Sequence, residues 1–81
     1  MTVRVKLFAV AKQLAGRGEV AVEVATGATV ADVERALIAA VPALADVVAH
    51  ARWAVDAEFA KTETGVAAQS EVALIPPVSG G

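Results

Sequence analysis

Cysteine is absent from this 81-residue sequence, and histidine occurs once, at His50. Without cysteine the chain cannot form a disulfide, a thiolate nucleophile or a cysteine-ligated zinc or iron–sulfur site. A single histidine cannot supply the paired imidazoles of a two-histidine metal site. The G-x-S-x-G motif of serine hydrolases does not occur either. A chain without cysteine is compatible with the reducing cytoplasm, where we expect the protein to act.

Long apolar runs and excess positive charge are also missing. The longest apolar run covers residues 36–45 and contains Pro42, whereas a membrane span needs about 20 residues. The apolar stretch after the first basic residues is too short for a secretory signal. The formal net charge is −2 at pH 7, which argues against nucleic acid as the main partner. We therefore expect neither a membrane nor a nucleic-acid partner.

The apolar content is high, but most of it is small. Hydrophobic residues make up 57% of the chain, and 20 of them are alanine and 15 are valine, with only three aromatic residues. This composition argues against disorder and predicts one domain with a small, valine-rich core. A chain of this size buries only about 60–65% of the surface that it exposes when unfolded, which leaves no room for a deep active site.

Hydrophobic periodicity predicts five strands and three helical segments. Period-two alternation predicts strands over residues 3–7, 19–24, 53–55, 58–60 and 71–75. Helical spacing predicts a short helix over 9–15 ended by Gly16, a main helix over about 30–41 begun by Thr29 and Asp32, and a short helix from Pro42 to about His50. Residues 56–57 form a turn, and Val66 is predicted to plug the core.

This order of elements predicts an α+β domain with a mixed sheet packed on one main helix. The β-grasp fold is one compact arrangement of that order. A ferredoxin-like sandwich is the alternative, although it requires two full helices and residues 9–15 are short for one. We assign residues 1–75 to the folded domain and residues 76–81 to a flexible C-terminal tail.

The tail is the chemically distinctive feature of the sequence. Pro76 and Pro77 cannot continue a β-ladder and favour an extended chain, so six residues can reach about 20 Å beyond the domain. Gly80 and Gly81 lack side chains and fit a narrow channel. The terminal carboxylate is ionised and unreactive until ATP converts it to an acyl-adenylate, which a sulfur nucleophile can turn into a thiocarboxylate. A frayed terminus without chemistry is the alternative.

The last eleven residues, EVALIPPVSGG, resemble the terminal signature of the small sulfur-carrier subunits of molybdopterin synthase, which are ubiquitin-like β-grasp proteins. Residues 5–9, 12–16 and 53–59 are also similar to that family, in the same order along the chain. Two turns depart from its pattern: residues 55–57 read Val-Asp-Ala rather than Val-Asn-Gly, and residues 68–70 read Ala-Gln-Ser rather than Asp-Gly-Asp. Neither departure touches the tail.

The resemblance implies a carrier mechanism. An E1-like activating enzyme uses ATP to adenylate Gly81, a sulfurtransferase supplies sulfur, and Gly81 becomes a thiocarboxylate. The tail, including Gly80, then enters the large subunit of molybdopterin synthase and donates sulfur to the cyclic pyranopterin precursor of the molybdenum cofactor. Most catalytic side chains belong to that large subunit, so this chain is a non-catalytic carrier within a heterotetramer. It binds no cofactor stably.

The resemblance also implies a partner-binding surface beside the tail. Strand alternation turns Phe8 and Ile75 away from the face that Leu7 and Leu74 bury. The partner-binding residues that match the family are Phe8, Phe59, Ile75, Pro76, Pro77, Val78 and Ser79. A satellite core cluster is the alternative, above all for Phe59. Arg4, Lys6 and Lys12 form either an electrostatic rim or an ordinary solvated surface.

Several other interpretations remain open at this stage. The chain could carry sulfur for thiamin or another pathway, form isopeptide bonds as a ubiquitin-like modifier, or serve as an interaction module without tail chemistry. Asp56 and Glu58 form a carboxylate pair, but no cleft around them favours acid–base catalysis. Trp53 is expected to pack in the core, and His50 to lie on the surface.

Overall fold

The computed structural model describes residues 1–77, and alternating apolar residues build its strands. In β1 (Thr2–Leu7), Val3, Val5 and Leu7 are buried, while the residues between them are exposed. In β2 (Glu19–Glu23), Val20 and Val22 are buried in the same way. The remaining elements are α1 (Ala9–Ala15), α2 (Val30–Ala40), the 3-10 turn η1 (Pro42–Leu44), α3 (Ala45–His50), β3 (Arg52–Val55), β4 (Glu58–Ala60) and β5 (Val72–Ile75). Every predicted element is therefore present, and no end is shifted by more than one residue.

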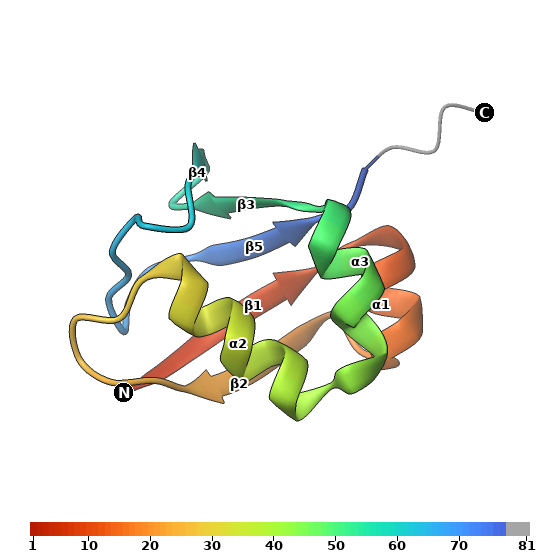
Figure 1. The fold of residues 1–81 in the computed structure, drawn as a ribbon, viewed down its shortest axis with the longest axis horizontal. Helices are drawn as coiled ribbons and strands as arrows, with labels where there is room; N and C mark the ends of the chain where they lie inside the picture. Colours follow the sequence, from red (N-terminus) through yellow and green to blue (C-terminus); the bar gives the residue numbers. More distant parts are fainter. Residues whose placement is uncertain (78–81) are drawn as a thin grey trace.

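The strands form one five-stranded mixed sheet in the order β2-β1-β5-β3-β4 (Figure 1). The β1 strand pairs with β2 antiparallel and with β5 parallel, and β3 pairs antiparallel with both β5 and β4. The ferredoxin-like alternative is wrong, because β1 and β2 are antiparallel neighbours and α1 is not a crossover helix.

The main helix, α2, lies across one face of the sheet (Figure 1) and begins where the sequence predicts. The backbone N–H of Thr29 donates to Oδ2 of Asp32 at 2.9 Å, and the Thr29 carbonyl accepts from Asp32 N–H at 3.0 Å. Val30, Val33 and Leu37 are buried against the sheet, as the helical spacing predicts. Their burial removes apolar surface from water, which is the main stabilising contribution.

The other predicted helical features are also confirmed. Gly16 ends α1 with a φ of 75°, the left-handed conformation in which a side chain is costly, and donates to the Lys12 carbonyl at 2.9 Å. Pro42 follows α2 and opens η1, which leads into α3. Leu44 and Val48 are buried, and Val66 plugs the core from the loop before β5.

Both turns that depart from the family pattern keep a defined geometry. Asp56 and Ala57 adopt φ values of 52° and 69°, the conformation that Asn-Gly takes more cheaply in a two-residue hairpin. Asp56 is also tied to the start of β5, since its Oδ1 accepts from Glu71 N–H at 2.9 Å and its N–H donates to the Glu71 carbonyl at 2.8 Å. In the second turn, Ser70 Oγ accepts from Ala67 N–H at 3.0 Å.

Candidate docking site

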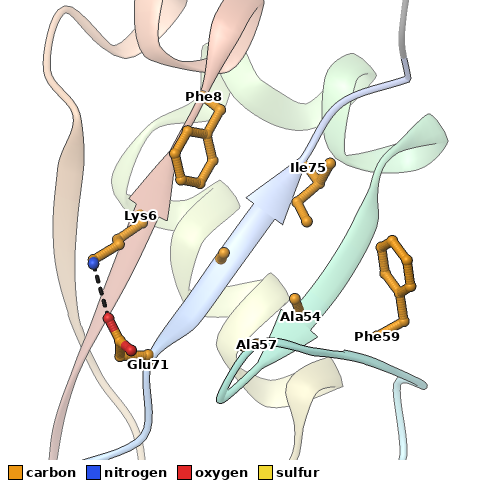
Figure 2. Close-up of a pocket in the computed structure, with 8 residues that line it drawn as sticks. Lys6, Phe8, Ala54, Ala57, Phe59, Glu71 and Ile75 are labelled. Carbon is orange, nitrogen blue, oxygen red and sulfur yellow. Dashed lines mark hydrogen bonds and ion pairs between the residues drawn. The ribbon is translucent and has the colours of Figure 1, made fainter.

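The face of the sheet opposite α2, called the open face below, contains an apolar hollow beside the end of β5 (Figure 2). The hollow has a volume of about 290 Å³. Large side chains stand around it and alanines form its floor: the lining residues are Lys6, Phe8, Ala54, Ala57, Phe59, Glu71, Ala73 and Ile75. The three apolar residues predicted for partner binding in the folded domain thus line one hollow, although they lie far apart in the sequence.

Each of these three residues is positioned by a different element. Phe8 follows β1 and is the N-cap residue of α1, where its extended backbone leaves the side chain 49% exposed. Phe59 lies in β4 opposite Ala54 and is 62% exposed. Ile75 is the last residue of β5 and is half-buried. Exposed aromatic side chains grouped in this way are typical of protein interaction surfaces, which supports the predicted docking role. That role stays our prediction.

Two ion pairs neutralise the bases of β1 on the same face. Lys6 Nζ lies 2.8 Å from Glu71 Oε1, and Arg4 Nη1 lies 3.0 Å from Glu19 Oε2. The hydrogen bond and the negative charge of Glu71 raise the pKa of Lys6 above its ordinary value. Both pairs are solvent-exposed, and pairs of this kind contribute little to stability. Lys6 borders the hollow, so of the predicted rim bases it is the one that the structure brings to the site.

Arg52 is a residue of this face that the sequence interpretation missed. Its guanidinium carbon lies 3.8 Å from the centroid of the Phe59 ring, which is a cation–π contact. Arg52 is also the cross-strand partner of Ile75. The available signal was the alternation of β3, which puts Arg52 and Ala54 on the face opposite Trp53.

The tail leaves the domain next to the hollow. Pro76 is buried and Pro77 is exposed, so Pro76 still packs on the domain. Val78, Ser79, Gly80 and Gly81 lie outside the described residues, and their predicted roles remain predictions. Because β5 ends beside Phe8 and Phe59, a partner bound at the hollow sits where the tail begins (Figure 2).

The remaining candidate residues have structural explanations. Trp53 is 4% exposed and belongs to the core, as predicted. His50 lies on the surface with Nδ1 3.1 Å from the Asp46 carbonyl, as predicted. Within residues 1–77, no three His, Cys, Asp or Glu side chains gather as metal ligands. In the same part of the chain, no helix has the length and apolar character to cross a membrane.

Comparison with known proteins identifies the family. The sequence pattern of the ThiS family matches residues 5–81. The chain belongs to the ThiS family. Among similar proteins, the molybdopterin synthase sulfur carrier subunit of Chlamydomonas reinhardtii is 36% identical over an alignment of 83 residues. The alignment covers both proteins completely. The resemblance inferred from the sequence is therefore confirmed.

Solved structures place this ThiS-family chain in the same fold. SAMP1 from Haloferax volcanii is 38% identical and superposes with a TM-score of 0.91, with both chains fully covered. A putative molybdopterin converting factor subunit 1 from Pyrococcus furiosus is 27% identical, with a TM-score of 0.85 over 96% of this chain and 99% of the other. These similarities confirm the predicted β-grasp, ubiquitin-like fold.

Proposed function

We propose that this chain is the sulfur-carrier subunit of a molybdopterin synthase. The observation that carries the proposal is the ThiS-family match, which runs from residue 5 to the terminal Gly80-Gly81. The 36% identity to a named molybdopterin synthase sulfur carrier subunit over its full length favours this pathway over thiamin or another one.

The proposed chemistry takes place at the Gly81 carboxylate. An E1-like enzyme transfers AMP from ATP to this carboxylate, which releases pyrophosphate and forms an acyl-adenylate. The terminal sulfur of a persulfide on a sulfurtransferase attacks the acyl carbon and displaces AMP, which forms an acyl disulfide. A thiol then cleaves this disulfide as the two-electron reductant, which leaves the thiocarboxylate on Gly81 and a disulfide between the two thiols. The large subunit of the synthase, within a heterotetramer, then passes this sulfur to the cyclic pyranopterin precursor. Because activation consumes ATP, we place the carrier in the cytoplasm.

The hollow on the open face supports a docking step in this cycle. Apolar surface next to the start of the tail is provided by Phe8, Phe59 and Ile75. A partner can bind the domain there while the tail enters the active site of that partner. Such a surface suits a carrier that must bind the large subunit, leave it and be recharged.

A mass measurement tests the proposal. The protein is incubated with the activating enzyme, ATP and a sulfide or persulfide donor, and its intact mass is recorded. A carrier gains the mass of one sulfur minus one oxygen. Deletion of Gly81 should abolish this gain, whereas Gly65→Ala should retain it because a Cβ at Gly65 meets no atom within 4 Å. If the mass of the full-length chain stays unchanged although the activating enzyme is active, the sulfur-carrier assignment is wrong.

A second candidate function is protein modification. It is favoured by the 38% identity to SAMP1, whose name is small archaeal modifier protein 1. In this role the activated Gly81 carboxyl forms an isopeptide bond with a lysine of another protein. Blots of cell extracts for larger species that contain this chain distinguish the two functions, since conjugates must disappear when Gly81 is deleted.

A further inference from the structure

We propose that Arg52, stacked on Phe59, binds a carboxylate of the large subunit when apolar side chains of that subunit cover the hollow. The inference rests on the proposed function, because it names the chemistry that the docking partner presents to this chain. It makes Arg52 a binding residue of the docking surface and predicts an acidic residue beside the apolar contact of the partner.

The charge balance of the open face singles out Arg52. Arg4 is paired with Glu19 at 3.0 Å, and Lys6 is paired with Glu71 at 2.8 Å. Arg52 makes no ion pair with any residue in the described range 1–77. Of these three bases, Arg52 therefore has a positive charge that no described carboxylate balances.

The stacking contact prepares Arg52 for a planar anion. With its carbon 3.8 Å from the ring centroid of Phe59, the guanidinium is held over the ring face. Its N–H groups donate to no acceptor within residues 1–77. A guanidinium that is stacked in this way keeps the donors at its edge free, and these match the two oxygens of a carboxylate. Less side-chain entropy is then lost when the anion binds.

The position of Arg52 makes a carboxylate the fitting occupant. Arg52 pairs across the sheet with Ile75, and its stacking partner Phe59 lines the hollow. When apolar side chains of a partner fill the hollow, water is excluded around the guanidinium, and its attraction for an anion strengthens. A guanidinium that stays unpaired in that setting disfavours binding. A carboxylate on the partner favours binding, so Arg52 selects partners that present one.

Binding measurements with the full-length chain and the purified large subunit test this inference. Arg52→Met keeps an apolar stem on Phe59 and removes the charge, and Arg52→Glu reverses the charge. We expect the dissociation constant to rise about tenfold for Arg52→Met and about a hundredfold for Arg52→Glu. Raising the salt concentration should weaken the binding of the wild-type chain and change that of Arg52→Met much less.

Arg35→Glu is the matched control, since it changes the net charge as Arg52→Glu does but lies on α2, on the opposite side of the sheet. Its dissociation constant should stay within about threefold of wild type. If Arg52→Met binds as tightly as wild type with the same salt dependence, Arg52 serves only to hold Phe59 and the inference is wrong.

The two proposals fail in distinguishable ways. The mass gain of the Arg52→Met chain at saturating activating enzyme reports the carrier chemistry independently of the large subunit. A normal mass gain with unchanged binding overturns the Arg52 inference alone. A wild-type chain that neither gains mass nor binds the large subunit overturns both.

Discussion

Leu7 and Phe8 are adjacent in the chain but have opposite environments, because the strand turns successive side chains to opposite faces. Leu7 is 2% exposed, and Phe8 is 49% exposed at the hollow. Phe8 therefore contributes less to folding than its size suggests, and its apolar surface is available to a partner. The division between stability and the proposed docking role thus falls between two neighbouring residues.

A pair of substitutions tests this division. We expect Phe8→Asp to weaken large-subunit binding at least tenfold while lowering the free energy of unfolding by less than about 1 kcal/mol. Leu7→Ala, the matched core variant, should lower the free energy of unfolding by about 3 kcal/mol. Urea unfolding and a binding titration measure the two effects. Unchanged binding of Phe8→Asp would exclude Phe8 from the docking surface.

Ala57 is strained in the present sequence. Its φ of 69° lies in the left-handed region, where the Cβ of an L-residue is crowded. We expect Ala57→Gly to raise the free energy of unfolding by about 1 kcal/mol, since glycine adopts this conformation without that cost. Ala60→Gly, in the regular strand β4, should instead destabilise the protein. A loss of stability on Ala57→Gly would show that the turn is not strained.

At the scale of single elements, α2 depends on the reciprocal cap between Thr29 and Asp32. The hydrogen bond from the Thr29 backbone lowers the pKa of Asp32 below its ordinary value, and the neighbouring Arg35 adds to this. A lowered pKa in the folded state means that the ionised carboxylate favours folding. This stabilisation is fully present above the pKa of the unfolded chain, about 3.9, and is lost as the pH falls through the folded-state value.

The pH dependence of unfolding checks this role. We expect Asp32→Ala to be less stable than wild type in urea at pH 7, with the difference shrinking below about pH 4 as the wild-type carboxyl is protonated. Asp32→Glu keeps an acid at the third helical position and should retain the pH dependence. A difference between wild type and Asp32→Ala that is constant from pH 7 to pH 3 would argue against the cap.

At the scale of the whole molecule, β5 joins two parts of the sheet. The β3–β4 pair is attached to β1 and β2 through β5, which runs parallel to β1 and antiparallel to β3. The same strand ends at the hollow and leads into Pro76 and Pro77, so the central element of the sheet also leads to the residues that we propose carry the chemistry.

Truncation tests this arrangement. A chain that lacks residues 71–81 should not fold, because β1 and β3 lose their shared partner and Val72 and Leu74 leave the core. A chain that lacks only residues 78–81 should retain the wild-type circular dichroism spectrum and unfolding midpoint. A cooperative unfolding transition in the chain that lacks residues 71–81 would contradict the central role of β5.

Much of the fold and part of the site could be predicted from the sequence because the signals are local. Alternation over residues 3–7 and 19–23 fixes which side chains face the core, and the Thr29–Asp32 pair fixes where the main helix begins. Gly16 and Pro42 end helices through their own backbone chemistry. The C-terminal Gly80-Gly81, read directly from the sequence, carries the proposed carrier function.

Only the tertiary structure decided which distant residues meet. No local signal specifies that β5 lies between β1 and β3, because strand order depends on the joint burial of all five apolar faces. That order brings Phe8, Phe59 and Ile75 around one hollow and places Arg52 over Phe59. The sequence by itself thus determined the elements and the terminus at which we propose the chemistry. Packing decided the proposed docking surface, since its parts come close only when the sheet is complete.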